Sequence, residues 1–224
     1  MRLLTVAHGT RKVAGNQVAA SLASAAGTRL GLTAVSTYVE LCEPLFADVA
    51  ASSAEPAVAV PLLLSTGYHL RVDLPAAVES APAVRLGPGL GPDPLLAAAQ
   101  VARLREAGAA PGQPVVLVAA GSNDPHATRD IERAGRLLAR SWGGPVRVAV
   151  LSGVGPRVAD VVRPGDAVSP YLLAPGFFAD RARDEALAAG ASATADVIGA
   201  HDAVVELICR RADALLAASI VASA

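Results

Sequence analysis

The sequence predicts an α/β protein of two similar domains, each a small parallel sheet between two layers of helices and related to the other by a pseudo-twofold. Two observations point to this class. Short apolar runs alternate with longer alanine-rich segments, and one sequence pattern occurs twice along the 224 residues. Continuously apolar runs rich in Val and Leu are typical of parallel strands covered on both faces. Strands that alternate with helices favour right-handed crossovers, and these build a parallel sheet.

Eight apolar runs are expected to be strands, and Gly, Pro or polar residues close most of them. They are residues 3–7, 34–39, 57–64, 84–86, 115–120, 146–151, 167–173 and 193–197. The segments between them are long enough for helices that return the chain to the same end of the sheet. They are residues 14–30, 43–54, 71–80, 92–107, 126–142, 156–163, 178–189 and 201–218.

The repeat is visible as matched glycines and prolines at a nearly constant offset. The offset is 112 residues for Gly9 and Gly121, and 109 for Pro61 and Pro170. Small loop deletions explain the drift. The Pro/Gly-rich segment 108–114 is the expected boundary. We therefore predict domains over residues 1–110 and 113–224.

The composition excludes several classes of protein. With 19 basic and 20 acidic residues and 3% aromatics, nothing indicates a nucleic-acid groove. No apolar run reaches the roughly 18–20 residues that span a bilayer. The first residues predict a core strand rather than a signal peptide. Cys42 and Cys209 are isolated in sequence, so neither a disulfide framework nor a zinc knuckle is expected. We expect a soluble cytoplasmic protein.

Three chemically versatile residues follow predicted strands of the first half. His8 directly follows the first strand, Glu40 directly follows the second, and His69 lies shortly after the third. Because ligands bind at the carboxyl ends of parallel strands, these side chains are expected at one edge of the sheet. Two imidazoles and a carboxylate suit Fe²⁺, Co²⁺ or Ni²⁺, and they equally suit proton transfer near neutral pH.

Each of these residues also has an ordinary structural interpretation. A histidine after a strand is commonly a hydrogen-bonded loop residue, and Glu40 could be an acid at a helix start. The second half favours function: it has Ala120 and Phe178 where the first has His8 and His69, and no acid near Leu151. A purely structural role would survive duplication more evenly.

These residues lie in motifs that resemble the sirohydrochlorin chelatase family, the small class II tetrapyrrole chelatases. His8-Gly9-Thr10-Arg11 is similar to that family's His-Gly-Ser-Arg opening, with Thr10 in place of the commoner serine. Glu40 is followed four residues later by Pro44, as in the family's acid-bearing segment. Residues 67–75 match its Gly-x-His-x-x-x-Asp-x-Pro pattern around His69, and residues 86–94 resemble its segment before the last helix of the domain.

The resemblance implies insertion of a divalent metal into sirohydrochlorin without ATP, with Fe²⁺ the leading candidate, Co²⁺ possible and Ni²⁺ also considered. His8, His69 and Glu40 would hold the metal and accept the two pyrrole protons. The first domain would carry this site, and the degenerate second domain would complete the tetrapyrrole cleft. Hydroxyls and cations near the histidines would bind the eight substrate carboxylates; these candidates are Thr10, Arg11, Ser65, Thr66 and Arg71.

Other interpretations remain open at this point. The chain could be a cobaltochelatase of the anaerobic cobalamin route, or a carrier that binds a metal or tetrapyrrole without turnover. The Gly-rich segment 87–92 fits neither a dinucleotide fingerprint nor a Walker loop, so no nucleotide is expected. Both repeats lie on one chain, so we expect a monomer.

Overall fold

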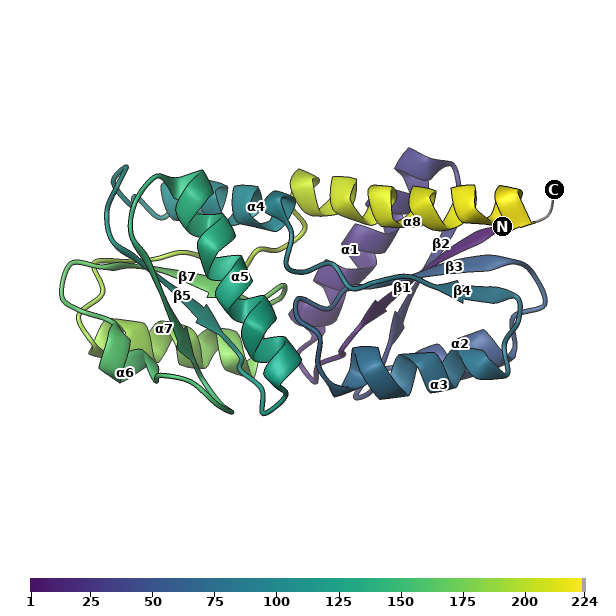
Figure 1. The fold of residues 1–224 in the computed structure, drawn as a ribbon, viewed down its shortest axis with the longest axis horizontal. Coiled ribbons are helices and arrows are strands. Elements are labelled where there is room, and N and C mark those ends of the chain that lie inside the picture. The colour runs from purple at the N-terminus through teal and green to yellow at the C-terminus, as the bar shows by residue number, and fades with distance from the viewer. Residues whose placement is uncertain (223–224) are drawn as a thin grey trace. The chain divides into compact units, whose positions relative to one another are not determined.

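The computed structural model describes residues 1–222, and side chains as far as residue 218. It contains two four-stranded sheets whose strands are all parallel (Figure 1). The first has the order β2-β1-β3-β4 and the second the order β6-β5-β7-β8. The strands of the first sheet are β1 (Arg2–Ala7), β2 (Thr33–Tyr38), β3 (Ala57–Pro61) and β4 (Val84–Leu86). Those of the second are β5 (Val115–Ala119), β6 (Val146–Val150), β7 (Ala167–Tyr171) and β8 (Ala193–Thr194).

Helices connect successive strands in the order that the sequence predicts. The longer ones are α1 (Val13–Leu30), α4 (Pro94–Glu106), α5 (Pro125–Trp142), α7 (Phe177–Ala188) and α8 (Asp202–Ala222). The shorter ones are α2 (Phe46–Ala51), the π-turn η1 (His69–Asp73), α3 (Leu74–Glu79) and α6 (Val158–Val161). The repeated α/β pattern of parallel sheets flanked by helices is therefore confirmed.

Several element ends differ from the predictions. The strand expected over 57–64 ends at Pro61, because the chain beyond it turns toward the π-turn that carries His69. The helix expected over 43–54 begins only at Phe46, as the residue before Pro44 is restricted to extended backbone. The last helix continues to Ala222, beyond the expected residue 218. In the described part of the chain, none of the helices is both long and apolar enough to cross a membrane.

The chain forms two compact units, and their boundaries differ from the predicted domains. Unit 1 contains residues 1–90 and 204–224, and unit 2 contains residues 91–203. The predicted division between residues 110 and 113 separates the sequence repeats. It does not separate the compact units, because each repeat's last helix packs in the other unit. Thus α8 covers the first sheet, and α4 packs on β7 and α5 of unit 2.

Specific contacts hold the exchanged helices. In unit 1 the Cys209 thiol lies 4.0 Å from the carbonyl oxygen of Ala26 in α1. In unit 2 the amide of Gln100 donates to the hydroxyl of Ser169 over 2.8 Å, and both residues are 1% exposed. A buried amide and hydroxyl that satisfy one another make this pairing specific, since either left alone would be costly.

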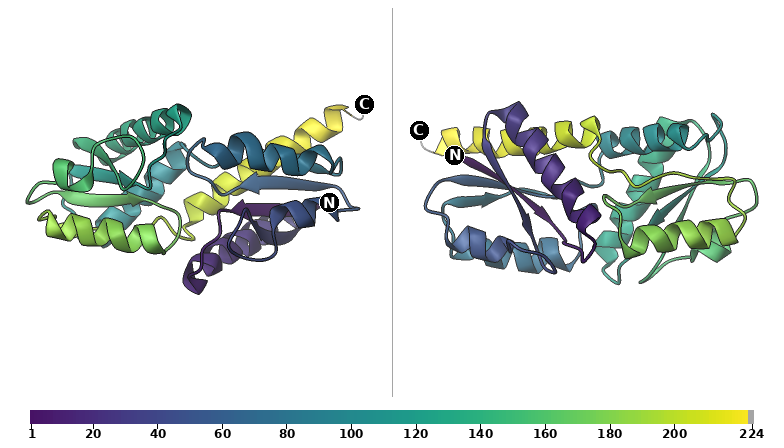
Figure 2. Two further views of the ribbon diagram at one scale, coloured as in Figure 1. Left: turned by 90° about the horizontal axis from the view of Figure 1, so that it is seen from below. Right: turned by 180° about the vertical axis from the view of Figure 1, so that it is seen from behind.

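Each sheet is covered on both faces within its own unit. In unit 1, α2 and α3 pack on the face that presents Leu4 and Val6, and α1 and α8 lie on the opposite face (Figures 1 and 2). In unit 2, α6 and α7 pack on one face, and α4 and α5 lie on the other. Because helices cover both faces of each sheet, polar side chains can gather only at the ends of the strands.

Candidate metal centre

His8 is placed by a glycine that lets two loops meet. Gly9 has φ 97°, and a Cβ atom there would lie 1.8 Å from the carbonyl oxygen of Glu40. Only glycine permits both this backbone conformation and this approach. The Glu40 amide donates to the His8 carbonyl over 3.1 Å. The loops after β1 and β2 are therefore joined at the two residues that carry the imidazole and the carboxylate.

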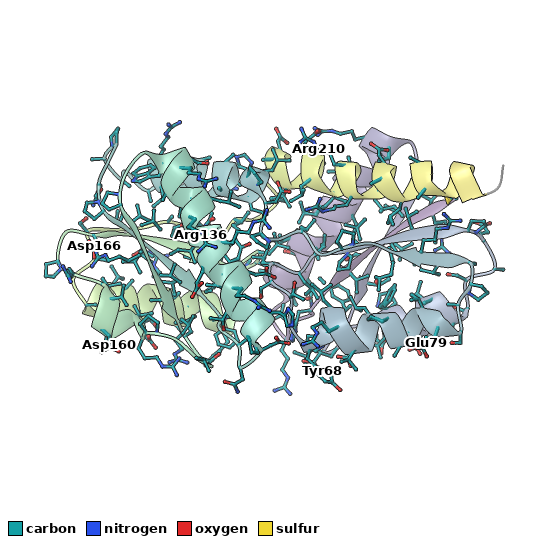
Figure 3. All side chains as sticks on the ribbon, viewed as in Figure 1. Tyr68, Glu79, Arg136, Asp160, Asp166 and Arg210 are labelled. Carbon is teal, nitrogen blue, oxygen red and sulfur yellow. The ribbon has the colours of Figure 1, made fainter. Side chains whose placement is uncertain are left out.

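His69 is placed by the π-turn that precedes α3. Pro75 cannot donate a backbone hydrogen bond, and its ring crowds the carbonyl four residues earlier, so a regular α-helix is disfavoured across this segment. The wider turn runs from His69 to Asp73. His69 Nδ1 lies 2.6 Å from Asp73 Oδ2. Tyr68 lies at the start of the helical segment and Glu79 at its far end (Figure 3).

The structure brings the three predicted ligands together. One ligand atom from each of His8, Glu40 and His69 lies within 4.8 Å of the others. His8 Nε2 is 3.6 Å from Glu40 Oε1, and the two imidazole rings meet edge to face with centroids 4.9 Å apart. The side chains of His8 and Glu40 are about half exposed. An ion could thus reach the group from solvent and keep positions open for a further ligand.

The hydrogen bonds of the rings decide which nitrogens can bind a metal. His69 Nδ1–H donates to the carboxylate of Asp73, and His8 Nδ1 lies 3.2 Å from the Gly9 carbonyl, which can only accept. With Nδ1 as the donor in both contacts, the Nε2 of each neutral ring is the nitrogen whose lone pair can bind a metal. A carboxylate behind a ligating histidine fixes its tautomer and orientation and raises its basicity. Asp73 therefore fits the role of a partner that orients His69.

The topology explains why these loops converge. From β1 the chain moves outward to β2 and then crosses back to β3 on the other side of β1. This reversal places the carboxyl ends of β1 and β3 at a switch point, where open α/β sheets commonly bind ligands. His8 and His69 follow those two strands, and Glu40 follows the neighbouring β2.

The five predicted substrate-binding residues lie in the same loops, in varied surroundings. Arg11 and Arg71 are exposed, whereas Thr10, Ser65 and Thr66 are half-buried. The hydroxyl of Thr10 accepts the backbone N–H of Lys12 over 3.2 Å, so it also helps to shape its own turn. Their roles toward a substrate remain predictions.

Asn16 is a site residue that the sequence analysis missed. Its Oδ1 accepts from the backbone N–H of Thr10 over 3.1 Å, and its Nδ2 donates to the Thr10 carbonyl over 2.8 Å. Its own carbonyl accepts from the hydroxyl of Tyr38, two residues before Glu40, over 3.3 Å. Asn16 thus connects the loops of His8 and Glu40. Nothing in the local sequence marks it, since an asparagine in a first helical turn is common.

The equivalent edge of the second sheet has no such group. Ala120, Ser152 and Phe178 occupy the places of His8, Glu40 and His69. Among the side chains that the structure describes, His8, Glu40 and His69 form the one group of three potential metal ligands. Burial, reinforced by the charges of Asp130 and Asp93, raises the pKa of Tyr171 at the end of β7 far above its usual value. That tyrosine is neutral and is not suited to bind an ion at ordinary pH.

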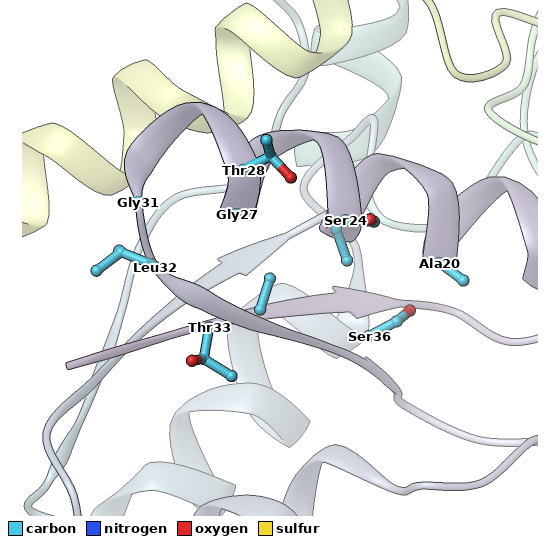
Figure 4. Close-up of a pocket in the computed structure, with 10 residues that line it drawn as sticks. Ala20, Ser24, Gly27, Thr28, Gly31, Leu32, Thr33 and Ser36 are labelled. Carbon is cyan, nitrogen blue, oxygen red and sulfur yellow. The ribbon is translucent and has the colours of Figure 1, made fainter.

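A hollow of about 590 Å³ lies between α1 and β2, away from the candidate ligands (Figure 4). It is lined mainly by small residues of both elements: Ala20, Ala23, Ser24, Gly27, Thr28, Gly31, Leu32, Thr33, Ala34 and Ser36. Gly27 explains the close packing beside it, because a Cβ atom there would lie 2.6 Å from the Cβ of Ala34. The hollow adjoins the beginning of β2, whereas Glu40 follows its end.

The fold and the site together define a class: two-repeat α/β proteins with a group of histidine and carboxylate side chains, able to hold a metal ion, at the edge of one sheet. The chain belongs to the CbiX family, whose model matches residues 2–107 and again residues 114–215. The two matched ranges fall one in each sequence repeat.

Known relatives agree with this assignment. The chain is 28% identical over 196 residues to the sirohydrochlorin ferrochelatase of Bacillus subtilis (strain 168), covering 78% of this chain and 74% of the relative. The solved structure of SirB from Bacillus subtilis with Fe³⁺ is 25% identical, with a TM-score of 0.79 and 94% of each chain covered.

Two further solved structures share the fold. The sirohydrochlorin chelatase SirB from Bacillus subtilis subspecies spizizenii, in complex with cobalt, is 24% identical with a TM-score of 0.75, covering 95% of this chain and 94% of that one. CbiX, described as the terminal enzyme for biosynthesis of siroheme in denitrifying bacteria, is 21% identical with a TM-score of 0.71, covering 96% and 99%.

Proposed function

We propose that this protein is a sirohydrochlorin chelatase that inserts a divalent metal into the tetrapyrrole without nucleotide hydrolysis. The observation that carries the proposal is the convergence of His8, Glu40 and His69 within 4.8 Å, at the edge of a sheet. Membership of the CbiX family and the sirohydrochlorin ferrochelatase among its relatives support the same reaction.

The reaction needs a metal held beside the ring and an acceptor for two pyrrole protons. Both Nε2 atoms and a Glu40 oxygen bind the incoming ion as substrate, leaving its remaining positions for the ring nitrogens. As the ring nitrogens replace the protein ligands, the released imidazoles and carboxylate become free to accept the protons. Glu40 Oε1 lies 3.6 Å from His8 Nε2, so a proton taken by one can be shared with the other.

Cations near the ligands suit a substrate with eight carboxylates. Arg11 is exposed three residues after His8, and Arg71 is exposed two residues after His69. A guanidinium binds a carboxylate through two parallel hydrogen bonds, which fixes orientation as well as charge. We propose that these two arginines, with the hydroxyls of Thr10, Ser65 and Thr66, bind the propionate and acetate groups.

The test is insertion of Co²⁺ or Fe²⁺ into sirohydrochlorin, followed by absorbance. His8→Ala and His69→Ala should each lower the insertion rate at least about 100-fold, because each removes a metal ligand. His126→Ala, at an exposed histidine of α5, is the matched control and should insert metal at the wild-type rate. Wild-type rates in both ligand variants would refute the assignment of the site.

The physiological metal is a separate question, because affinity for divalent ions follows a general order and cells select by supply. We propose Fe²⁺, giving siroheme, with Co²⁺ and the cobalamin route as the alternative. Anaerobic insertion rates with Fe²⁺, Co²⁺ and Ni²⁺ at equal concentration would separate the three. A carrier without turnover would instead retain one metal tightly in calorimetry and form no metallated tetrapyrrole.

All three ligands come from one chain, so the metal centre needs no second copy. We propose a monomer, to be checked by light scattering coupled to size exclusion.

A further inference from the structure

Leu41, directly after Glu40, has an unusual backbone conformation. It is the one non-glycine residue with positive φ in the described chain, at φ 65°. Its side chain is also exposed, with 50% of the residue accessible. Left-handed backbone is unfavourable for a branched apolar side chain, and an exposed leucine gains little from burial to offset this. Folding of the loop therefore does not explain why leucine is there.

The second repeat shows which residue this backbone prefers. The counterpart of Leu41, 112 residues on, is Gly153, with φ 67°. The same offset relates Gly9 to Gly121, so the pairing needs no further alignment. The loop is thus built alike in both halves, and only the half with the metal ligands has a side chain at this position.

The loops around Leu41 and Gly153 are held by different hydrogen bonds, and the difference leaves room for the side chain of Leu41. At Gly153 a Cβ atom would lie 2.4 Å from the backbone of Ser122, and the Ser122 carbonyl accepts from the Val154 N–H over 3.0 Å. In the first half the counterpart of Ser122 is Thr10, whose carbonyl accepts from Asn16 Nδ2 instead. Asn16 therefore holds the His8 loop in an arrangement that accommodates a Cβ atom at Leu41.

A second exposed apolar group adjoins another ligand. Tyr68 immediately precedes His69, is 64% exposed, and has its ring 6.4 Å from the imidazole of His69. Its counterpart, Phe177, is 70% exposed and pairs with Phe178 in the same edge-to-face manner. An exposed aromatic group is thus common to both halves, whereas the strained leucine occurs only beside the metal centre.

We propose that Leu41 is a substrate-binding residue that packs against the flat face of the tetrapyrrole next to the metal ligands, and that Tyr68, beside His69, adds a second apolar contact. This inference rests on the proposed function. A tetrapyrrole has charged groups at its rim and an apolar conjugated face, so its site needs apolar contacts as well as cations. Strain kept at one residue of a site is typical of positions that function requires.

The test compares Leu41→Ala with Leu41→Gly. Both remove the branched isopropyl end of the side chain, and both should raise KM for sirohydrochlorin roughly 10-fold, the size expected for losing most of a buried leucine contact. Only the glycine relieves the backbone, so Leu41→Gly should raise Tm by about 2–4 °C while Leu41→Ala leaves it near wild type. Leu187→Ala, at a 54% exposed leucine in α7, is the control and should change neither KM nor Tm.

Metal and tetrapyrrole are measured separately. KM for Co²⁺, and Co²⁺ binding without tetrapyrrole, should stay at wild-type values in both Leu41 variants. An unchanged KM for sirohydrochlorin would overturn the inference. A rise in KM for Co²⁺ alone would also overturn the inference, because Leu41 would then act only by holding Glu40 in place.

Binding of metal-free sirohydrochlorin, followed by absorbance titration, distinguishes this inference from the proposed function. If the wild type binds the tetrapyrrole in a Leu41-dependent manner but inserts no metal, the proposed function fails and the inference stands. If metal insertion depends on His8 and His69 but binding does not depend on Leu41, the inference fails alone. No binding of sirohydrochlorin to the wild type would overturn both.

Discussion

At the edge of the first sheet, Gly9 lets the loop after β1 approach Glu40; at the same edge of the second sheet, Gly121 lets the matching loop approach Ser152. The joining hydrogen bonds are also equivalent, from Glu40 to His8 and from Ser152 to Ala120. The backbone arrangement is therefore the same in both halves, although only the first half has the candidate ligands. A loop scaffold built by glycine and main-chain hydrogen bonds does not depend on the side chains that it presents.

The two halves also differ in what surrounds the candidate ligands. His69 is oriented by Asp73 over 2.6 Å, whereas the counterpart of Asp73 in the second half is the fully buried Ala182. Restoring chemistry to the second edge would thus require ligands, space and an orienting acid.

The largest expected effect comes from transplanting the ligands. Ala120→His with Phe178→His should leave one Co²⁺ bound per chain, because no carboxylate completes the set. Adding Ser152→Glu should create a second site, at least about 10-fold weaker than the first since Ala182 cannot orient the new imidazole. Calorimetric titration with Co²⁺ gives both stoichiometry and affinity.

The same triple variant carrying His69→Ala isolates the transplanted site and serves as its control. A second tight site already present in the double variant would show that the carboxylate is dispensable.

A smaller effect is expected from removing the orienting acid of the first half. Asp73→Asn keeps the shape of the side chain but loses the charge that fixes His69, so Co²⁺ affinity should fall about 10–100-fold. Asp184→Asn, at an exposed acid of α7, is the control. Equal Co²⁺ affinity in the two variants would mean that the 2.6 Å contact has no part in metal binding.

The smallest expected effect is on the pH dependence of stability, and it concerns Tyr171, the last residue of β7. Its counterpart in the first half is Leu62, which has no ionisable group. Burial raises the pKa of Tyr171, so the unfolded chain releases this proton near pH 10 while the folded chain keeps it. The contribution of Tyr171 to the free energy of unfolding is therefore constant below pH 10. It falls as the pH rises above 10, by about 1.4 kcal/mol at pH 11. Urea unfolding of the wild type and Tyr171→Phe at pH 8 and pH 11 measures this term. A fall of equal size in both proteins would assign it to other groups.

The position of the three candidate ligands at one edge of the first sheet could be predicted from the sequence alone. His8, Glu40 and His69 could be placed at one edge because each follows an apolar run, and parallel strands end at a common edge. Leu41 was within reach of the same reasoning, since the 112-residue offset pairs it with Gly153. Asn16 was not, because its importance lies in hydrogen bonds to Thr10 and Tyr38 that no spacing predicts.

The sequence by itself determined the repeat, the class of fold and the half that holds the candidate ligand group, because these depend on local periodicity and on which residues follow each strand. The tertiary structure alone decided which sheet each terminal helix covers. The segments 92–107 and 201–218 look alike as alanine-rich helices, and either could cover either sheet. Long-range contacts made the choice: Gln100 pairs with Ser169 and Cys209 packs against Ala26, which places α4 in unit 2 and α8 in unit 1.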